Sequence, residues 1–239
     1  MWASESRSLP FNRQWLRSNT QVFAQNYVIR GKVLKGNRLP SLRKRVAREA
    51  AALLYTSQEK EYKQAKKQAA KMLRVRVLPS NLEVAEELDK IAEEKEGSSR
   101  RELLLRMRKE ALQIMETLED FNARLVGSVW RGTAYQNSDI DILTFSQDPK
   151  PVLDQLQKYG YRVTSSEWRS VTKGGKKESS FHIHVVLSSG DEAEVIVRDP
   201  EKLGRLERCE IYGDTVIGLS PPQLLKVLKE SPLQKFVPT

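Results

Sequence analysis

The sequence predicts an α+β fold, in which a helical N-terminal region precedes a mixed sheet with flanking helices. Up to about residue 120, apolar residues recur at helical spacing. From Arg124 onward, short apolar runs separated by hairpin-type turns replace that period. We therefore expect an N-terminal arm over residues 1–39, a helical region over 40–120 and an α+β domain over 121–239.

Composition sets the broad class. With 239 residues, 39% hydrophobic and 30% charged, the chain can bury a real core and should be globular. No run of eighteen apolar residues and no N-terminal apolar segment occurs, so neither a membrane span nor a secretory signal is expected. The one cysteine, Cys209, excludes a disulfide framework and has no visible base partner. A cytoplasmic location is the expectation.

The net charge of +10 is unevenly distributed. Residues 1–76 hold 18 Lys and Arg against 4 Asp and Glu, a net charge of +14, whereas the remainder carries −4. This asymmetry favours a polyanionic partner, most simply RNA, bound through the basic residues of 1–76. Aromatic residues scattered through 1–39 could stack on bases. The alternatives are a solvated basic face and an arm docked on its own domain.

The helical region is expected to begin at Ser41, the N-cap after Pro40, with an apolar period that continues to Met72. Its other face is a cationic stripe of nine residues: Arg43, Lys44, Arg45, Arg48, Lys60, Lys63, Lys66, Lys67 and Lys71.

Two further helices are expected in the helical region. The first runs from about Leu82 to Glu96 and ends at Gly97. The second covers roughly 100–120, with Ser99 and Glu102 as a capping box.

The C-terminal part is predicted to form strands and two helices. A helix capped by Ser220, with Pro221 near its first turn, closes the chain. An earlier helix is expected at "PKPVLDQLQKYG", and the strands are expected at "RLVGSV", "DIDILTF", "YRVTSSEWRSVT", "SFHIHVVL" and "EAEVIV".

The strand "DIDIL" carries two aspartates, Asp139 and Asp141, which point to the same face because side chains alternate along a strand. Two neighbouring carboxylates repel each other unless a cation lies between them. Mg²⁺ prefers oxygen ligands, and two such ions about 3.5–4 Å apart can clamp the oxygens of phosphoryl transfer. The pattern therefore predicts a two-magnesium site.

The turn "GSVWRGT" upstream of the aspartates is the expected nucleotide-binding segment. Gly127 lets the backbone approach a phosphate, and the amide groups and hydroxyl near Ser128 can hold a triphosphate. Gly132 and Thr133 form a second tight turn, and Arg131 could reach a phosphate. The loop "KGGKK" could contact phosphates or be a flexible hairpin tip.

A third carboxylate is expected from a neighbouring strand. Glu192 and Glu194 of "GDEAEVIVRD" share a face, and Glu194, deeper in the strand, is the better candidate. The alternative is that Glu194 is a surface residue on an edge strand. His182 and His184 share a face of a strand that should neighbour Glu194, where they could touch substrate, hold a metal or simply be partly exposed.

These motifs resemble a known superfamily. The elements "VGS", ten intervening residues and "DIDI" resemble the signature of the DNA polymerase beta-like nucleotidyltransferases. The fuller string "LVGSVWRGTAYQNSDIDIL" is similar to class I, archaeal-type CCA-adding enzymes and to their poly(A)- and oligoadenylate-type relatives. With the tail "VIGLSPPQLLKVLK", the resemblance extends over most of residues 123–230.

The resemblance implies residue roles. In this reading the domain over 121–239 is a nucleotidyltransferase catalytic domain, in which Gly127 and Ser128 hold the triphosphate. Asp139 and Asp141 ligate the metals, and Glu194 takes the third-carboxylate position, where the family often has Asp. The chain also lacks the large C-terminal region with which CCA-adding enzymes grip tRNA, so the helical region is expected to bind the acceptor.

The expected activity is template-independent transfer of a nucleoside monophosphate from an NTP to a hydroxyl, most simply of a tRNA-like RNA, with two Mg²⁺ ions as cofactors. One alternative is nucleotidylylation of a protein or small molecule, of the AMP-transfer type. Another is an inert RNA-binding module that kept the fold.

Overall fold

The structure is a computed structural model that describes residues 38–173, 176–205 and 207–238, with side chains from residue 41 onward and without those of 172–177. Residues Leu39–Thr239 form one compact unit. The predicted N-terminal arm and the tip of the "KGGKK" hairpin lie outside the described residues.

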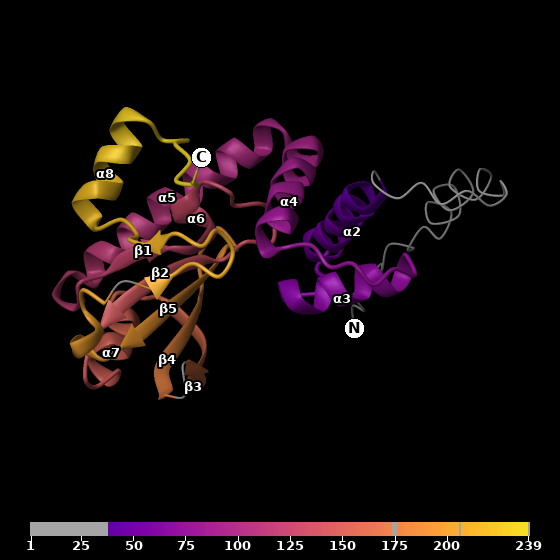
Figure 1. Ribbon diagram of the computed structural model, residues 1–239. Coiled ribbons are helices and arrows are strands. Elements are labelled where there is room, and N and C mark those ends of the chain that lie inside the picture. The colour runs from indigo at the N-terminus through magenta and orange to yellow at the C-terminus, as the bar shows by residue number, and fades with distance from the viewer. Residues whose placement is uncertain (1–37, 174–175, 206, 239) are drawn as a thin grey trace, which may run out of the picture. The chain divides into compact units, whose positions relative to one another are not determined.

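A five-stranded mixed sheet forms the centre of the described unit, with strand order β1-β2-β5-β4-β3 (Figure 1). The β2–β5 pair is parallel and the other pairs are antiparallel, so the predicted α+β class with a mixed sheet is confirmed. The strands are β1 Arg124–Val126, β2 Ile140–Phe145, β3 Arg162–Lys173, β4 Lys176–Val186 and β5 Glu192–Arg198, and a separate small sheet pairs β6 Glu207–Arg208 with β7 Thr215–Val216.

One face of the sheet forms the main core with α5 (Ser98–Thr117) and α7 (Lys150–Lys158). Every second residue of β2 and β5 is buried there, because side chains alternate along a strand. The remaining residues, including Asp141 and Glu194, belong to the opposite face. The residues buried in the core are Ile140 and Ile142 from β2 and Ala193, Val195 and Val197 from β5.

A second core lies among α2 (Arg38–Tyr55), α3 (Tyr62–Met72) and α4 (Asn81–Glu96). The predicted single helix from Ser41 to Met72 is wrong, because the chain turns between α2 and α3. Ser57 takes a positive φ of 55° there, and the Thr56 hydroxyl bonds the Ala52 carbonyl. The turn lets the small side chains of α3 pack against those of α2, and it leaves Met72 exposed.

The starts of α2, α4 and α5 differ from the prediction by one to three residues. Ser80 and Glu83 form a capping box for α4, which ends as expected at Gly97. The box expected from Ser99 and Glu102 is absent, because α5 begins directly after Gly97 and has no side-chain cap bond. The boundary expected after residue 120 falls inside the described unit, since α5 shares the core of the sheet.

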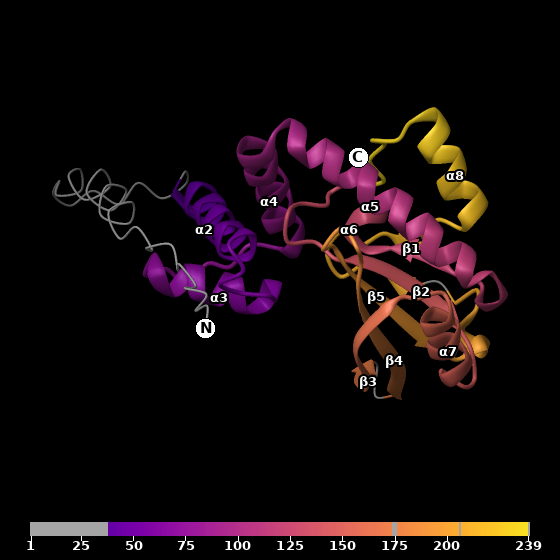
Figure 2. The same cartoon turned by 180° about the vertical axis from the view of Figure 1, so that it is seen from behind.

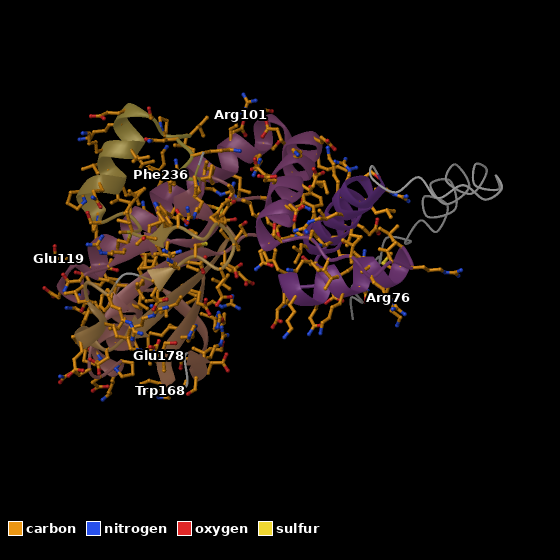
Figure 3. The ribbon with its side chains drawn as sticks, in the orientation of Figure 1. Arg76, Arg101, Glu119, Trp168, Glu178 and Phe236 are labelled. Carbon is orange, nitrogen blue, oxygen red and sulfur yellow. The ribbon has the colours of Figure 1, made fainter. Side chains whose placement is uncertain are left out.

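Arg108 of α5 ties three segments together. Its side chain is fully buried, and burial lowers its pKa to about 10. With no carboxylate partner among the described residues, the guanidinium donates to two carbonyls of α6 (Gly127–Arg131) and two of the C-terminal tail. The tail follows α8 (Pro221–Glu230), whose predicted Ser220 cap is confirmed, and returns toward α5 and α6 at Phe236 (Figure 3). The four acceptors are the carbonyl oxygens of Val129, Trp130, Pro232 and Gln234.

Figure 2 shows the same elements from behind, with α5 passing across the sheet. Two short 3-10 helices, η1 Glu119–Phe121 and η2 Pro200–Lys202, complete the fold. Within the described ranges, no helix combines the length and apolar character needed to cross a membrane.

Candidate active site

The turn from β1 into α6 brings the backbone of Gly127 against Asp141. The strand β1 pairs antiparallel with β2, and Val126 lies opposite Asp141. Helix α6 starts at the next residue, so the strand predicted over "RLVGSV" is wrong beyond Val126. Gly127 has a φ of +69°, and a Cβ there would lie 1.9 Å from Asp141 Oδ2. Glycine is needed at this position because the carboxylate occupies the space of a side chain.

The parallel pairing of β2 with β5 aligns the acidic residues in two neighbouring pairs. Asp141 lies opposite Glu194, and Ile140 lies opposite Ala193. Asp139 directly precedes β2, and Glu192 begins β5, so these two carboxylates lie at the same end of the pair of strands. The two aspartates and the two glutamates, 53 residues apart in sequence, thus lie together. We call these four residues, Asp139, Asp141, Glu192 and Glu194, the acidic cluster.

Burial and the neighbouring carboxylates raise the pKa values of the aspartates in the acidic cluster. Burial, followed by the charges of Glu194 and Asp139, raises the pKa of Asp141 to about 7. Burial, Glu192 and Glu194 also raise the pKa of Asp139, while His184 and Lys60 act in the opposite direction. A carboxyl pKa raised in this way marks a site that gains from a bound cation.

Lys60 shows that the helical region reaches the acidic cluster. It lies in the turn between α2 and α3, and its charge acts on Asp139. The Asn137 side-chain amide, two residues before Asp139, donates to the Tyr55 carbonyl at 2.8 Å. Tyr55 stacks on Tyr135 with ring centroids 5.7 Å apart. The α2–α3 turn is therefore held beside the loop that leads into β2.

Glu194 is engaged by side chains of the next two strands. Its Oε1 accepts hydrogen bonds from Arg169 Nη1 at 2.8 Å and from His182 Nδ1 at 2.9 Å. His184 lies directly opposite Glu194 in the β4–β5 register. The prediction that the histidine strand neighbours Glu194 is therefore confirmed, and β5 is an interior strand rather than an edge.

Arg131 does not reach toward the acidic cluster, which corrects the expectation that it contacts a phosphate. Its guanidinium is buried, with both Nη atoms bonded to Asp214 at 2.8 and 2.7 Å and Nη1 also donating to the Phe236 carbonyl. It also lies over the rings of Trp130 and Tyr212, at 4.3 and 4.7 Å from their centroids. This buried ion pair commits Arg131 to holding the C-terminal segment against α6.

Gly132 and Thr133 likewise have structural roles, at the end of α6. Gly132 ends α6 with a φ of +74°, and a Cβ there would lie 2.7 Å from the Gln234 carbonyl oxygen. The Thr133 amide donates to the Ser128 carbonyl and closes the last turn of α6, while its own carbonyl accepts from Arg100. Of the predicted nucleotide-binding residues, Gly127 and Ser128 are the two that open α6 beside Asp141. Their role in holding a triphosphate stays a prediction.

Four residues that matter at or near the acidic cluster were not identified from sequence. Arg108 and Asp214 gave no signal, because their partners lie more than 80 positions away or on main-chain carbonyls. Lys60 was placed in a basic stripe but not near Asp139. Arg169 alternates with Glu167 in a polar strand, which is the pattern of any half-exposed strand.

The residues present fit a hard divalent cation at Asp139 and Asp141. Both offer oxygen donors, and Asp141 has no cation among the causes of its raised pKa. Among the described side chains, no group of three or more His, Cys, Asp or Glu is placed to hold a metal ion. Glu194 directs Oε1 to Arg169 and His182, so it can join a metal only through its second oxygen.

Asp139 and Asp141 thus lie at the start of β2, with Glu194 in register on the next strand and the Gly-Ser start of α6 beside them. The family model described as "Nucleotidyltransferase domain" matches residues 108–212. The segment over residues 108–212 is therefore similar to nucleotidyltransferase domains, in agreement with the resemblance that the sequence motif predicted.

Two solved structures are similar to part of the chain. Cid1 in complex with the UTP analogue UMPNPP is 16% identical, with 49% of this chain and 37% of that chain covered and a TM-score of 0.30. A cytoplasmic RNA terminal U-transferase is 17% identical, with 49% and 34% covered and a TM-score of 0.26. The chain thus spans about a third of their length. No curated protein sequence matches it.

We predict that Gly127→Ala slows transfer by roughly 100-fold without unfolding the protein. The new methyl group must displace the Asp141 carboxylate, and misplacement by about 1 Å costs roughly 100-fold in rate. The measurement is the rate of pyrophosphate release, with far-UV circular dichroism as a check on folding. Gly160→Ala is the matched control, because Gly160 has a φ of +80° and nothing within 4 Å of a Cβ. Equal activity of the two variants would contradict the assignment.

We predict that Asp141→Asn stabilises the metal-free protein at high pH. Folding raises the pKa of Asp141 from 3.8 to about 7, so its contribution to stability is full below about pH 4 and is lost as the pH rises through 7. Asparagine stays neutral, so above pH 7 the variant should be more stable by roughly 2–4 kcal/mol. The gap should close toward pH 4.

The measurement is urea denaturation with a chelator present, from pH 4.5 to 8.5. Asp120→Asn, which removes an exposed carboxylate outside the acidic cluster, is the control and should show no such pH-dependent gap. A stability difference for Asp141→Asn that is the same at every pH would refute the electrostatic account.

Proposed function

We propose that the protein transfers a nucleoside monophosphate from an NTP to a hydroxyl of RNA, without a template and with Mg²⁺. The observation that carries the choice of RNA is a row of lysines that begins beside the acidic cluster. We define the lysine row as Lys60, Lys63, Lys67 and Lys71, all exposed.

The lysine row follows one face of α3. Residues at three- and four-residue spacing share a helix face, and the opposite face of α3 is buried through Ala65 and Ala69. Lys60, at one end of the row, is close enough to Asp139 for its charge to lower the pKa of that carboxyl group. A single-stranded acceptor with its 3′ end at the aspartates can place successive phosphates along the lysine row.

Three other members of the predicted cationic stripe are engaged within the protein. Arg43 pairs with Glu83 at 2.7 Å, and Arg48 pairs with Glu94 at 2.8 Å. Lys66 donates to the Asn81 side chain. The lysine row, with the exposed Lys44 and Arg45 of α2, therefore carries the charge of the stripe that is available for phosphates.

The proposed chemistry is direct displacement at the α-phosphorus. The acceptor hydroxyl oxygen attacks it, the bond to the oxygen that bridges the α- and β-phosphorus breaks, and pyrophosphate leaves with the bonding electron pair. In this proposal Glu194 takes the hydroxyl proton through Oε2, and the start of α6 at Gly127 and Ser128 holds the triphosphate. Divalent ions, when bound at Asp139 and Asp141, neutralise the carboxylates and the charge that develops on the phosphates.

A cytoplasmic location and a tRNA-like acceptor belong to the same proposal. The single cysteine, Cys209, supports a reducing compartment. The lysine row supports an acceptor with a single-stranded end, which a tRNA provides.

The test of transfer uses each α-labelled NTP in turn with Mg²⁺ and total cellular RNA. We expect label to enter RNA with the wild type and not with Asp141→Asn, whose side chain keeps its shape against Gly127. The labelled band identifies the acceptor class, and the successful NTP identifies the base. Label in protein bands would instead favour nucleotidylylation of a protein, and RNA binding without any label would favour an inert binding module.

The test of the lysine row compares two neutralised pairs. We expect Lys63→Gln with Lys67→Gln to weaken binding to labelled single-stranded RNA and to reduce the slope of log K against log[salt] by about 1.4, because each lost phosphate contact contributes about 0.7. Lys109→Gln with Lys229→Gln, which removes two exposed lysines of α5 and α8, is the matched control. Fluorescence anisotropy over a salt series measures both. The same loss in both pairs would show that net charge alone decides.

A further inference from the structure

Glu194 is held by one of its two carboxylate oxygens. Both the Arg169 Nη1 bond of 2.8 Å and the His182 Nδ1 bond of 2.9 Å end on Oε1. In the part of the chain that the structure describes, Oε2 has no hydrogen-bond partner. The side chain of Glu194 is 16% exposed, so Oε2 is not simply immersed in solvent.

His182 is fixed by contacts on both sides of its ring. Nε2 lies 2.8 Å from the Ser180 hydroxyl, and the side chain is 12% exposed. When Nδ1 donates to Glu194, a neutral imidazole accepts the hydroxyl proton of Ser180 at Nε2. The ring therefore has a defined orientation, and its bond to Glu194 is not an incidental surface contact.

Arg169 is fixed in the same manner. Its Nε donates to Glu167 at 2.8 Å, and its Nη2 lies 3.0 Å from His184 Nε2. A planar guanidinium with contacts on Nε, Nη1 and Nη2 has little freedom to turn. Every group that holds Glu194 therefore comes from the backbone-paired strands β3 and β4.

These contacts form one polar row across the sheet. Asp141, Glu194 and His184 lie opposite one another in the registers of β2, β5 and β4. Ile183 and Val185, which alternate with the histidines, are buried in the core on the other face. The row therefore shares the face of the acidic cluster, and Arg169 and His182 approach Glu194 from the side away from Asp141.

We infer that Arg169 and His182 are positioning residues that hold Glu194 by Oε1 and keep Oε2 available for the acidic cluster. A glutamate has three rotatable side-chain bonds, so its carboxylate is poorly placed unless other groups fix it. Groups that orient a metal ligand from behind typically contribute 10–100-fold to metal affinity or activity. The inference rests on the proposed metal-dependent transfer and assigns a task to Arg169 and His182 within it.

A double-mutant cycle tests the inference, with Mn²⁺ binding measured by electron paramagnetic resonance without nucleotide, and with the transfer rate as a second readout. Arg169→Ala should weaken Mn²⁺ binding and slow transfer by about 10-fold or more. In a Glu194→Gln background the same change should have less than about a twofold effect, because a positioning residue acts through its partner.

His182 provides a test by conservative rescue. His182→Asn keeps an N–H donor that can reach Glu194 and should retain most Mn²⁺ binding, whereas His182→Ala should lose it to the same extent as Arg169→Ala. Arg162→Ala, which removes an exposed arginine from the same strand as Arg169, is the matched control and should change neither readout.

Two outcomes would overturn the inference. Tighter Mn²⁺ binding by Arg169→Ala would show that the guanidinium is a counter-ion that competes with the metal. Equal losses in the wild-type and Glu194→Gln backgrounds would show a general structural role. Failure of the proposed function looks different, because wild-type protein would then bind no Mn²⁺ or transfer no nucleotide to RNA.

Discussion

The parallel pairing of β2 with β5 is the constraint on which the site depends. It places Asp141 opposite Glu194 although the two are far apart in sequence, and it brings Asp139 and Glu192 to the same end. The cost is that the carboxylates are partly buried and repel one another, and both effects raise the pKa of Asp141. The protein offsets part of this cost with Arg169 of β3, which donates to Glu194, and with Lys60, whose charge acts on Asp139.

Two buried arginines hold the turn from β1 into α6. Arg108 gathers carbonyl oxygens of α6 and of the C-terminal tail, and Arg131 pairs with Asp214 beneath the same helix. A buried guanidinium that loses its acceptors is costly, so these bonds restrain α6 strongly. The start of α6, where Gly127 meets the Asp141 carboxylate, therefore has a rigid support that is remote from the chemistry.

The helical region contributes packing as well as positive charge. It has its own core of α2, α3 and α4, which includes small alanines that let α2 and α3 approach closely. The turn between these helices brings Lys60 near Asp139, and Tyr55 stacks on Tyr135 in the loop before β2. The turn thus brings a basic residue of the helical region close to the acidic cluster, which a single continuous helix could not do.

The sequence by itself determined the fold class, the strand alternation, the Gly-Ser and Asp-x-Asp elements of the site and the cap of α8, because these depend on neighbouring residues. Local period could not reveal the break between α2 and α3, since Ala65 and Ala69 continue the apolar pattern and only packing against α2 favours the turn. Tertiary structure alone decided that Arg131 serves Asp214 rather than a phosphate, and that Glu194 is held by Arg169 and His182. Those partners are set by strand order and register, which bring together groups that no spacing along the chain relates.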